Sequence, residues 1–265
     1  MMSMTKQKFD LLFYKWYTVQ EQCISRKGLK NMKDILIKNF SALNIDITES
    51  QIKQFEKYYS FLVEYNEKVN LTAITEKEDV AIKHFSDSGS LLSVCNIKNG
   101  ACVIDVGTGA GFPGMVLKIL RPDLNVTLLD SLNKRIVFLE KCAELLGIEV
   151  NCIHGRAEEI AKKPEHREKY DIVTSRAVAN LTTLSEYCLP FAKKGGVFAP
   201  LKGPAAEDEI AAAANAIKIL GGKLRETASV AIGELSHKIV LIDKITYTPQ
   251  KYPRNGAKPI NNPLK

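Results

Sequence analysis

The sequence predicts an α/β fold in which an N-terminal helical module precedes a doubly wound, mostly parallel sheet of seven strands. From residue 101 onward, short apolar runs alternate with helical stretches. Strands that alternate with helices form parallel βαβ units with right-handed crossovers. Near the end of the chain, two strand-like runs are separated by a link too short for a parallel crossover, so they must form an antiparallel pair. We therefore expect a parallel sheet whose last strand is antiparallel.

The helical module is expected over residues 32–95. Its clearest signal is Thr48-Glu-Ser-Gln51, a capping box in which a hydroxyl and an amide reciprocally satisfy backbone donors. Apolar residues then recur at helical spacing on one face: Ile52, Phe55, Tyr59, Leu62 and Val63. A further helix is predicted from about Lys77 through Phe85.

The sheet is expected over residues 96–246. Its strands are predicted at 101–106, 125–130, 148–153, 170–175, 196–201, about 222–231 and 237–246. Helices are predicted between them at 113–121, 132–146, 156–162, 180–190 and 205–220. The connections between these elements are short, as is usual within one compact domain.

Both ends of the chain are basic. The net charge is +7, with +5 in residues 1–33 and +5 in 244–265, which leaves −3 between them. Residues 1–31 are expected to be a poorly ordered, dispensable extension, with a possible short helix at 9–20. Residues 247–265 are expected to be a basic tail that its prolines keep extended. Such an end is either solvated or follows a polyanion such as RNA, and cofactor binding is not expected to need it.

Composition excludes several classes of protein. No apolar run approaches the roughly 20 residues that span a bilayer, and no signal peptide is recognisable. The six cysteines form no C-x-x-C pair, and no histidine stands at metal-ligand spacing from another ligand. Most of the cysteines lie in apolar runs, where reduced, buried thiols are the common case. We therefore expect a cytoplasmic protein without a structural metal.

A glycine-rich loop follows the first predicted strand. The strand 101–106 runs into Gly107-Thr-Gly109-Ala-Gly111-Phe-Pro-Gly114, and glycines let a backbone turn sharply and approach a ligand closely. Ligands of parallel sheets bind beyond the carboxyl ends of the strands. Asp130 closes the next strand, where its carboxylate suits the ribose hydroxyls of either NAD or S-adenosylmethionine.

Three features favour S-adenosylmethionine over NAD. Residues 109–114 spell G-x-G-x-x-G, the dinucleotide fingerprint, which is a weak signal when taken alone. The tight turn begins at Gly107, however, so the dinucleotide register would start two residues late. Asp105 ends the first strand, and Arg156-Ala-Glu158 follows the third, where a loop facing adenine would lie. NAD and a purely structural turn remain the alternatives.

Several motifs together resemble one protein family. In chain order they are Tyr65-Asn66, Asn70-Leu-Thr72, His84-x-x-Asp-Ser88, Asp105–Gly114, Leu129–Arg135, Thr174–Ala177, Leu201-Lys-Gly203 and Lys251-Tyr-Pro-Arg254. Over roughly residues 32–265 this series resembles the glucose-inhibited division protein B family, the RsmG methyltransferases of small-subunit ribosomal RNA. The resemblance implies a class I methyltransferase fold, with 96–246 as the S-adenosylmethionine-binding domain.

The resemblance also implies a reaction, a cofactor and site residues. The reaction is methylation of a guanine N7 in 16S ribosomal RNA, with S-adenosylmethionine as the donor. The family implies donor contacts by Gly107, Phe112, Ala157, Glu158 and Arg176, with Asp130 beside the ribose, and the loop itself adds Gly109 and Gly111. Because N7 carries a lone pair and no proton, we expect in-line transfer without a general base.

Five cations are candidates for contacts with RNA: Lys134, Arg135, Lys202, Lys251 and Arg254. Lys134 and Arg135 open a helix just after Asp130, where a solvated helix start and a phosphate contact are equally compatible with the sequence. The expected partner is ribosomal RNA or the ribosomal particle, and the protein is expected to be a monomer.

Other functions fit the sequence less well. His84, Asp87 and Ser88 could be mistaken for a hydrolase triad, but one short segment seldom places a base between its nucleophile and its acid. The remaining alternatives are an NAD-dependent oxidoreductase and a non-catalytic RNA-binding protein.

Overall fold

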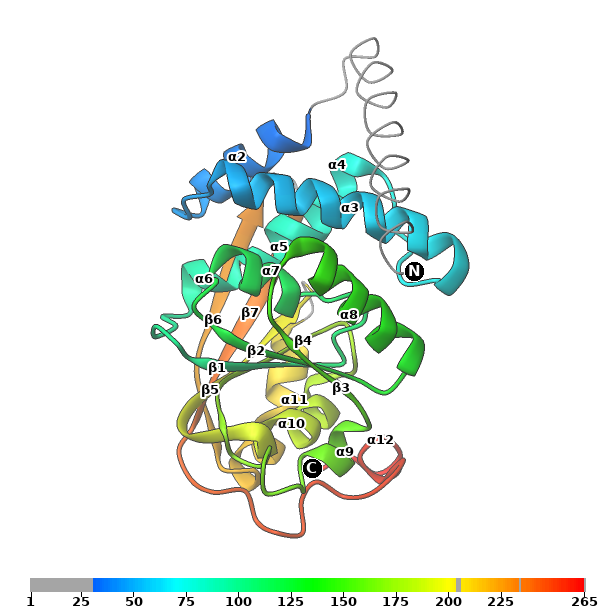
Figure 1. Cartoon of the computed structure of the whole chain (residues 1–265). Helices are drawn as coiled ribbons and strands as arrows, with labels where there is room; N and C mark the ends of the chain where they lie inside the picture. The colour runs from blue at the N-terminus through cyan, green and yellow to red at the C-terminus, as the bar shows by residue number, and fades with distance from the viewer. Residues whose placement is uncertain (1–30, 204–205, 234, 265) are drawn as a thin grey trace, which may run out of the picture.

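A computed structural model describes residues 31–203, 206–233 and 235–264, in which helices cover both faces of one seven-stranded sheet (Figure 1). The strands are β1 (Cys102–Val106), β2 (Asn125–Asp130), β3 (Asn151–His154), β4 (Tyr170–Arg176), β5 (Ala192–Lys202), β6 (Gly222–Ile232) and β7 (Leu235–Lys244). Their order is β3-β2-β1-β4-β5-β7-β6. Strand β7 runs antiparallel to β5 and β6, and the pairs among β1 to β5 are parallel. The predicted fold class is confirmed.

The helices follow the predicted pattern closely. The module contains α2 (Met32–Ala42), α3 (Glu49–Val69), α4 (Lys77–Val80), the π-helical η1 (Ala81–Ser86), α5 (Asp87–Gly89) and α6 (Leu91–Val94). The sheet carries α7 (Gly114–Leu120), α8 (Asn133–Leu146), α9 (Ala157–Ile160), α10 (Leu181–Cys188), the 3₁₀ turn η2 (Leu189–Phe191) and α11 (Ala206–Ile219), and α12 (Lys258–Asn261) follows it. Strand β3 begins three residues later than predicted, because Gly147 ends α8 in a left-handed conformation and Ile148 N still bonds to Ala143 O.

The start of the module is also well defined. The predicted capping box is present, since Gln51 N donates to Thr48 Oγ1 (3.3 Å) and Thr48 N donates to Gln51 Oε1 (2.8 Å). Asn31 caps α2 through Lys33 N (3.3 Å). Asn31 therefore belongs to the module, one residue before the predicted boundary. The predictions made for residues 1–30, including Cys23, lie outside the described residues.

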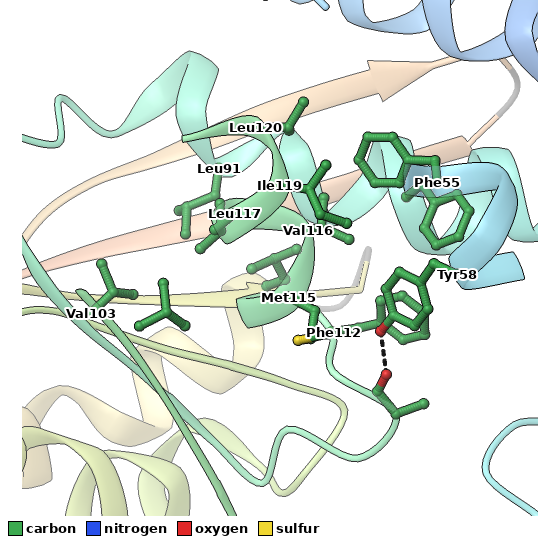
Figure 2. Packing of buried hydrophobic residues seen from close by; sticks show 14 of the residues in the cluster. Phe55, Tyr58, Leu91, Val103, Phe112, Met115, Val116, Leu117, Ile119 and Leu120 are labelled. Atoms are coloured by element: carbon green, nitrogen blue, oxygen red, sulfur yellow. Dashed lines mark hydrogen bonds between the residues drawn. The ribbon is translucent and has the colours of Figure 1, made fainter. Parts of the chain in front are cut away.

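The helical module and the sheet share one hydrophobic core. Phe55 and Tyr58 of α3 pack beside Phe112 and Met115 at the start of α7 (Figure 2). The Gln51 side chain donates to Ile119 O (2.9 Å) and Leu120 O (3.1 Å) and so satisfies carbonyls that the end of α7 leaves unpaired. The module is thus a layer on the sheet and positions α7.

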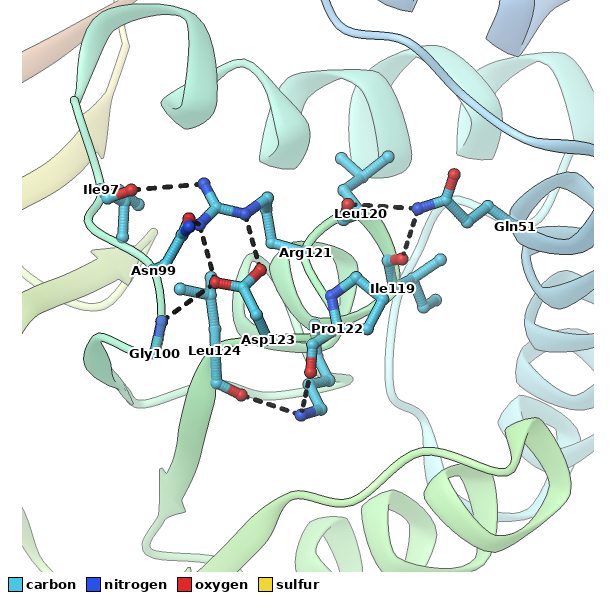
Figure 3. A network of polar contacts seen from close by, with 11 residues as sticks. Gln51, Ile97, Asn99, Gly100, Ile119, Leu120, Arg121, Pro122, Asp123 and Leu124 are labelled. Carbon is cyan, nitrogen blue, oxygen red and sulfur yellow. Dashed lines mark hydrogen bonds and ion pairs between the residues drawn. The ribbon is translucent and has the colours of Figure 1, made fainter.

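A polar network closes the turn between α7 and β2 (Figure 3). Arg121 donates to Asp123 Oδ1 (2.7 Å), to Asn99 Oδ1 (3.0 Å) and to Ile97 O (3.3 Å). Asp123 in turn accepts from Gly100 N (3.0 Å), and its hydrogen bond with Arg121 holds the pKa of this carboxyl well below its usual range. The network ties the link that precedes β1 to the start of β2.

The C-terminal segment does not form the extended basic tail that the sequence predicted. Lys244, one of the cations counted there, is buried at the end of β7 and donates to Leu189 O (2.8 Å) and Leu220 O (3.2 Å). Beyond it, Arg167 donates to Thr248 O (2.8 Å) and Tyr252 O (2.9 Å). Prolines disfavour helix but do not prevent packing, so the segment folds back onto the domain.

The burial of Lys244 predicts a pH dependence of stability. Burial lowers the pKa of Lys244 from 10.5 to about 8. Between these values the unfolded chain holds a proton that the native protein has lost, so the free energy of unfolding should rise with pH from about 8 to 10.5. Denaturant unfolding at pH about 8 and about 10 should show a smaller rise in Lys244→Met. The exposed Lys223→Met should behave as wild type, and an equal rise in all three proteins would contradict the prediction.

Candidate active site

The glycine loop lies at the carboxyl edge of the sheet, between β1 and α7. Gly107, Gly109 and Gly111 have φ values of 71°, 61° and 97°, a region that L side chains rarely adopt. Gly107 N and Thr108 N both donate to Leu129 O, at 2.8 and 3.1 Å. These bonds fasten the start of the loop to the end of β2.

Asp105 supports the loop from below. Its buried Oδ2 accepts from Thr108 Oγ1 (2.7 Å) and from Gly114 N (2.8 Å), so one carboxylate holds both ends of the loop and satisfies the first backbone N–H of α7. Burial raises the pKa of Asp105 to about 6. A Cβ on Gly114 would lie 3.0 Å from Asp105 Cβ and 2.3 Å from Leu128 Cδ2. Only glycine fits between this carboxylate and β2.

Asp130 holds the loop from the side. Its Oδ2 accepts from Gly109 N (2.9 Å) and Arg135 Nη1 (3.2 Å), and its Oδ1 accepts from Leu132 N (2.9 Å). The residue is only 2% exposed, yet it lines the pocket beside the loop. A carboxylate offers about four lone-pair sites, so one remains for a hydroxyl in that pocket.

Four of the predicted donor residues line this one pocket: Gly107, Asp130, Ala157 and Glu158. Glu158 is 6% exposed, and Arg156 Nη1 lies 3.8 Å from its carboxylate. Apolar walls come from Val106, Leu129 and Val178. The pocket thus combines two buried carboxylates, which accept hydrogen bonds, with apolar surface, as a nucleoside requires.

Residues that the sequence did not single out complete the pocket. Val178 is held against Gly107 because Ala177 adopts a φ of 56°, and a Cβ on Gly107 would lie 2.6 Å from Val178 Cγ2. Tyr187 of α10 and three residues of the C-terminal segment, Gly256, Ala257 and Ile260, also line it. The low charge of residues 255–262 was the one sequence signal that this segment packs against the domain.

Phe112 and Arg176 form a second cluster, on the module side of the loop. The Arg176 guanidinium lies 5.0 Å from the centre of the Phe112 ring, and the His84 ring stacks on that ring at 4.6 Å. Arg176 Nη1 donates to Asp87 Oδ2 (2.7 Å). The predicted Arg176 is half-buried and is paired with the module, which satisfies its guanidinium.

His84 is held neutral in this cluster. Arg176 Nη2 lies 3.1 Å from His84 Nδ1, and the Lys83 carbonyl oxygen lies 3.1 Å from the same nitrogen. Nε2 lies 2.9 Å from Thr72 Oγ1. Burial first, and then the charge of Arg176, lower the pKa of His84 to about 4. With Asp87 paired to Arg176, no hydrolase triad is assembled among His84, Asp87 and Ser88.

Tyr58 connects the module to the loop. Its buried hydroxyl donates to Ala110 O (Figure 2), and burial raises its pKa well above the usual 10, which keeps the donor protonated. A Cβ on Gly111 would lie 2.5 Å from Tyr58 Oη and 2.6 Å from Met115 Cγ. Gly111 therefore faces the module, and Tyr58 is a loop-supporting residue that the helical pattern alone did not identify.

The predicted RNA-binding cations have different surroundings. Arg135, Lys202 and Arg254 are ion-paired with Asp130, Glu209 and Glu186, respectively. Lys134 and Lys251 remain exposed, with Lys134 Nζ donating to Val69 O (3.1 Å) and Lys251 Nζ 5.3 Å from the centre of the Tyr252 ring. In the described part of the chain, no cluster of His, Cys, Asp and Glu could hold a metal ion, and no helix is long and apolar enough to cross a membrane.

The fold and the site together define the class of protein. A solved structure of a mutant of MtNAS in complex with S-adenosylmethionine is 16% identical and superposes with a TM-score of 0.51, covering 73% of this chain and 72% of that chain. At this identity the likeness is one of fold, and it is the fold of the class I methyltransferases.

The family follows from sequence similarity. Ribosomal RNA small subunit methyltransferase G of Alkaliphilus oremlandii (strain OhILAs) is 52% identical over 237 residues, which cover 88% of this chain and 99% of the relative. The protein of the same description from Exiguobacterium sp. (strain ATCC BAA-1283 / AT1b) is 50% identical, with 86% and 97% covered. Residues 51–239 match the GidB family, rRNA small subunit methyltransferase G, and the chain belongs to this family.

The bond between Tyr58 and the loop gives a prediction about loop shape. Tyr58→Phe leaves the buried Ala110 carbonyl without its partner, which should cost about 1–3 kcal/mol of stability. We also expect a weaker affinity for S-adenosylmethionine, by roughly three- to ten-fold, in calorimetric titration. Tyr59→Phe is the matched control, since its hydroxyl bonds to Thr75 O (3.2 Å), away from the loop. Equal donor affinities in both variants would show that the bond does not shape the site.

The surroundings of His84 predict how its ring titrates. Its NMR titration should have a midpoint near pH 4 rather than 6.5. Between these values the unfolded chain binds a proton that the native protein does not, so stability should fall as the pH falls from 6.5 towards 4. His84→Gln should reduce this fall, whereas the exposed His154→Gln should leave it unchanged. A midpoint near 6.5 would refute the neutral, buried assignment.

Proposed function

We propose that this protein transfers a methyl group from S-adenosylmethionine to N7 of a guanine in small-subunit ribosomal RNA. The observation that carries the proposal is the pocket in which a glycine loop and two buried carboxylates, Asp130 and Glu158, meet at the carboxyl edge of the sheet. Membership of the GidB family supports the reaction and the RNA. When bound, S-adenosylmethionine supplies the electrophilic methyl group.

The residues of the pocket suit the adenosine part of this donor. Asp130 keeps a lone pair for the ribose hydroxyls, and Glu158 with Ala157 would meet the edge of the adenine. Gly107 and Gly109 would let the backbone approach the ligand, since a Cβ on Gly109 meets no protein atom within 4 Å.

Phe112 and Arg176 extend the proposed site along the loop towards the helical module. We retain both as donor contacts, and the pairing of Arg176 with Asp87 would keep the guanidinium in place. No general base is required for N7, which carries a lone pair and no proton. The low pKa of His84 supports transfer without a general base. An imidazole with a pKa of about 4 is poorly matched to proton transfer near neutral pH.

We also propose how the protein contacts RNA and in which compartment it acts. Of the five predicted RNA contacts, Lys134 and Lys251 are the exposed cations that a phosphate could approach without breaking an internal ion pair. We propose a monomer that acts in the cytoplasm, where thiols stay reduced. Burial raises the pKa of Cys142 and Cys188, which are free thiols, and so makes them unreactive.

The proposal is tested first by methyl transfer. Small-subunit RNA from cells that lack this gene should gain 7-methylguanosine when it is incubated with the protein and labelled S-adenosylmethionine. Nucleoside mass spectrometry identifies the position on the base. Turnover of NAD, or RNA binding without any transfer, would support one of the alternative functions instead.

Gly109 tests the donor site itself. A side chain there would enter, from a backbone with positive φ, open space that the donor occupies in this proposal, so Gly109→Val should abolish S-adenosylmethionine binding in calorimetric titration. Gly147→Val is the matched control for backbone strain, because Gly147 has a φ of 64°, no atom near its Cβ and a position at the end of α8. A folded Gly109→Val protein with unchanged affinity would overturn the assignment.

A further inference from the structure

We infer that the C-terminal segment 252–264 forms one wall of the donor pocket, on its adenosine side, and that Arg254 is the residue that positions it. The inference rests on the proposed function and goes beyond it. It replaces the expectation that the tail is either solvated or follows RNA and that donor binding does not need it.

The wall itself is made by the turn at Gly256 and by α12. Gly256, Ala257 and Ile260 line the same pocket as Ala157 and Glu158. Figure 1 shows α12 beside α9, the short helix that begins at Ala157. Residues about one hundred positions apart in the chain therefore face each other across the pocket.

One ion pair anchors the segment. Arg254 donates to Glu186 through its backbone N (2.8 Å), Nε (2.9 Å) and Nη2 (2.6 Å). Glu186 lies on α10 and is 1% exposed, so its charge depends on this partner. A guanidinium that donates to both oxygens of a carboxylate fixes the orientation of the side chain as well as its position. Gly256 follows Arg254 by only two residues, so the same contact positions the turn at Gly256.

Further contacts hold the segment on both sides of Arg254. Before it, Tyr252 is buried and Arg167 donates to Tyr252 O (2.9 Å). After it, Lys162 donates to Asn255 Oδ1, and Thr183 Oγ1 donates to the carbonyl of the buried Pro259 (3.1 Å). The wall is therefore a docked part of the domain.

The exposed aliphatic residues at this wall indicate the chemistry of the ligand. Ile260 is 62% exposed and Val178 is 42% exposed, although both line the pocket. A flat apolar ring bound in this pocket would remove part of their surfaces from water, while Glu158 offers an acceptor to an amino group at the edge of the ring. Adenine has both properties.

The charges of the segment favour the same role. Arg254 is ion-paired with Glu186, and Lys258 is the only cation between residues 255 and 264. Apolar and uncharged groups thus predominate where the segment meets the pocket, whereas a phosphate-binding strap would present free cations there.

The experiment measures ligand binding to full-length protein by calorimetric titration. The ligands are S-adenosylhomocysteine and 5′-methylthioadenosine, which share the adenosine part and differ in the amino-acid part. Ile260→Ala should weaken both by about three- to ten-fold, and Arg254→Ala by at least as much. Ile245→Ala is the matched control, because Ile245 is exposed and is not among the pocket-lining residues. It should bind both ligands as wild type does.

The outcomes separate this inference from the proposed function. Failure of the wild-type protein to bind either ligand would overturn the proposed function. Wild-type binding with unchanged affinity in Ile260→Ala would overturn the inference, and this variant changes only an exposed side chain, so it should fold even if Arg254→Ala does not. A lower salt dependence of RNA affinity in Arg254→Ala, with donor affinity unchanged, would make Arg254 a phosphate contact and would also overturn it.

Discussion

The glycine loop keeps its shape because two buried carboxylates hold it, Asp105 from below and Asp130 from the side. A buried carboxylate is costly unless donors surround it, and the backbone and hydroxyl groups of the loop are those donors. These hydrogen bonds offset part of that cost, although burial still raises the pKa of Asp105. Because Asp130 also binds the start of α8 through Leu132 N, the pocket, β2 and the following helix form one unit.

The helical module supplies the third support. Tyr58 and Phe85 pack around Phe112, while Asp87 and His84 orient Arg176. The Gln51 side chain donates to the last two carbonyl groups of α7. A change in the module would therefore reach the pocket by displacing the loop, even though the pocket-lining residues lie outside the module.

Much of this arrangement was predictable, and the failures have a common cause. The periodicity of apolar residues gave the order and type of the elements, and the spacing of the glycines gave the loop, because both depend on neighbours in the chain. The surroundings of Lys244, Arg135 and Arg254 were not predictable, since each is paired through the folded structure. Arg254 and Glu186 are 68 positions apart, and no local pattern shows that a charge will be buried beside its partner. The αL conformation of Ala177, which sets Val178 against the loop, likewise carries no residue signature, because alanine is not a residue that favours it.

A wall built from residues beyond β7 has a consequence for biosynthesis. All seven strands and the glycine loop precede residues 252–264 in the chain, so a chain terminated before residue 252 would hold them and lack one side of the pocket. Such a chain would contain the whole sheet but would bind the donor more weakly. Full donor affinity would thus require that the segment carrying Arg254 has been made and has docked on Glu186.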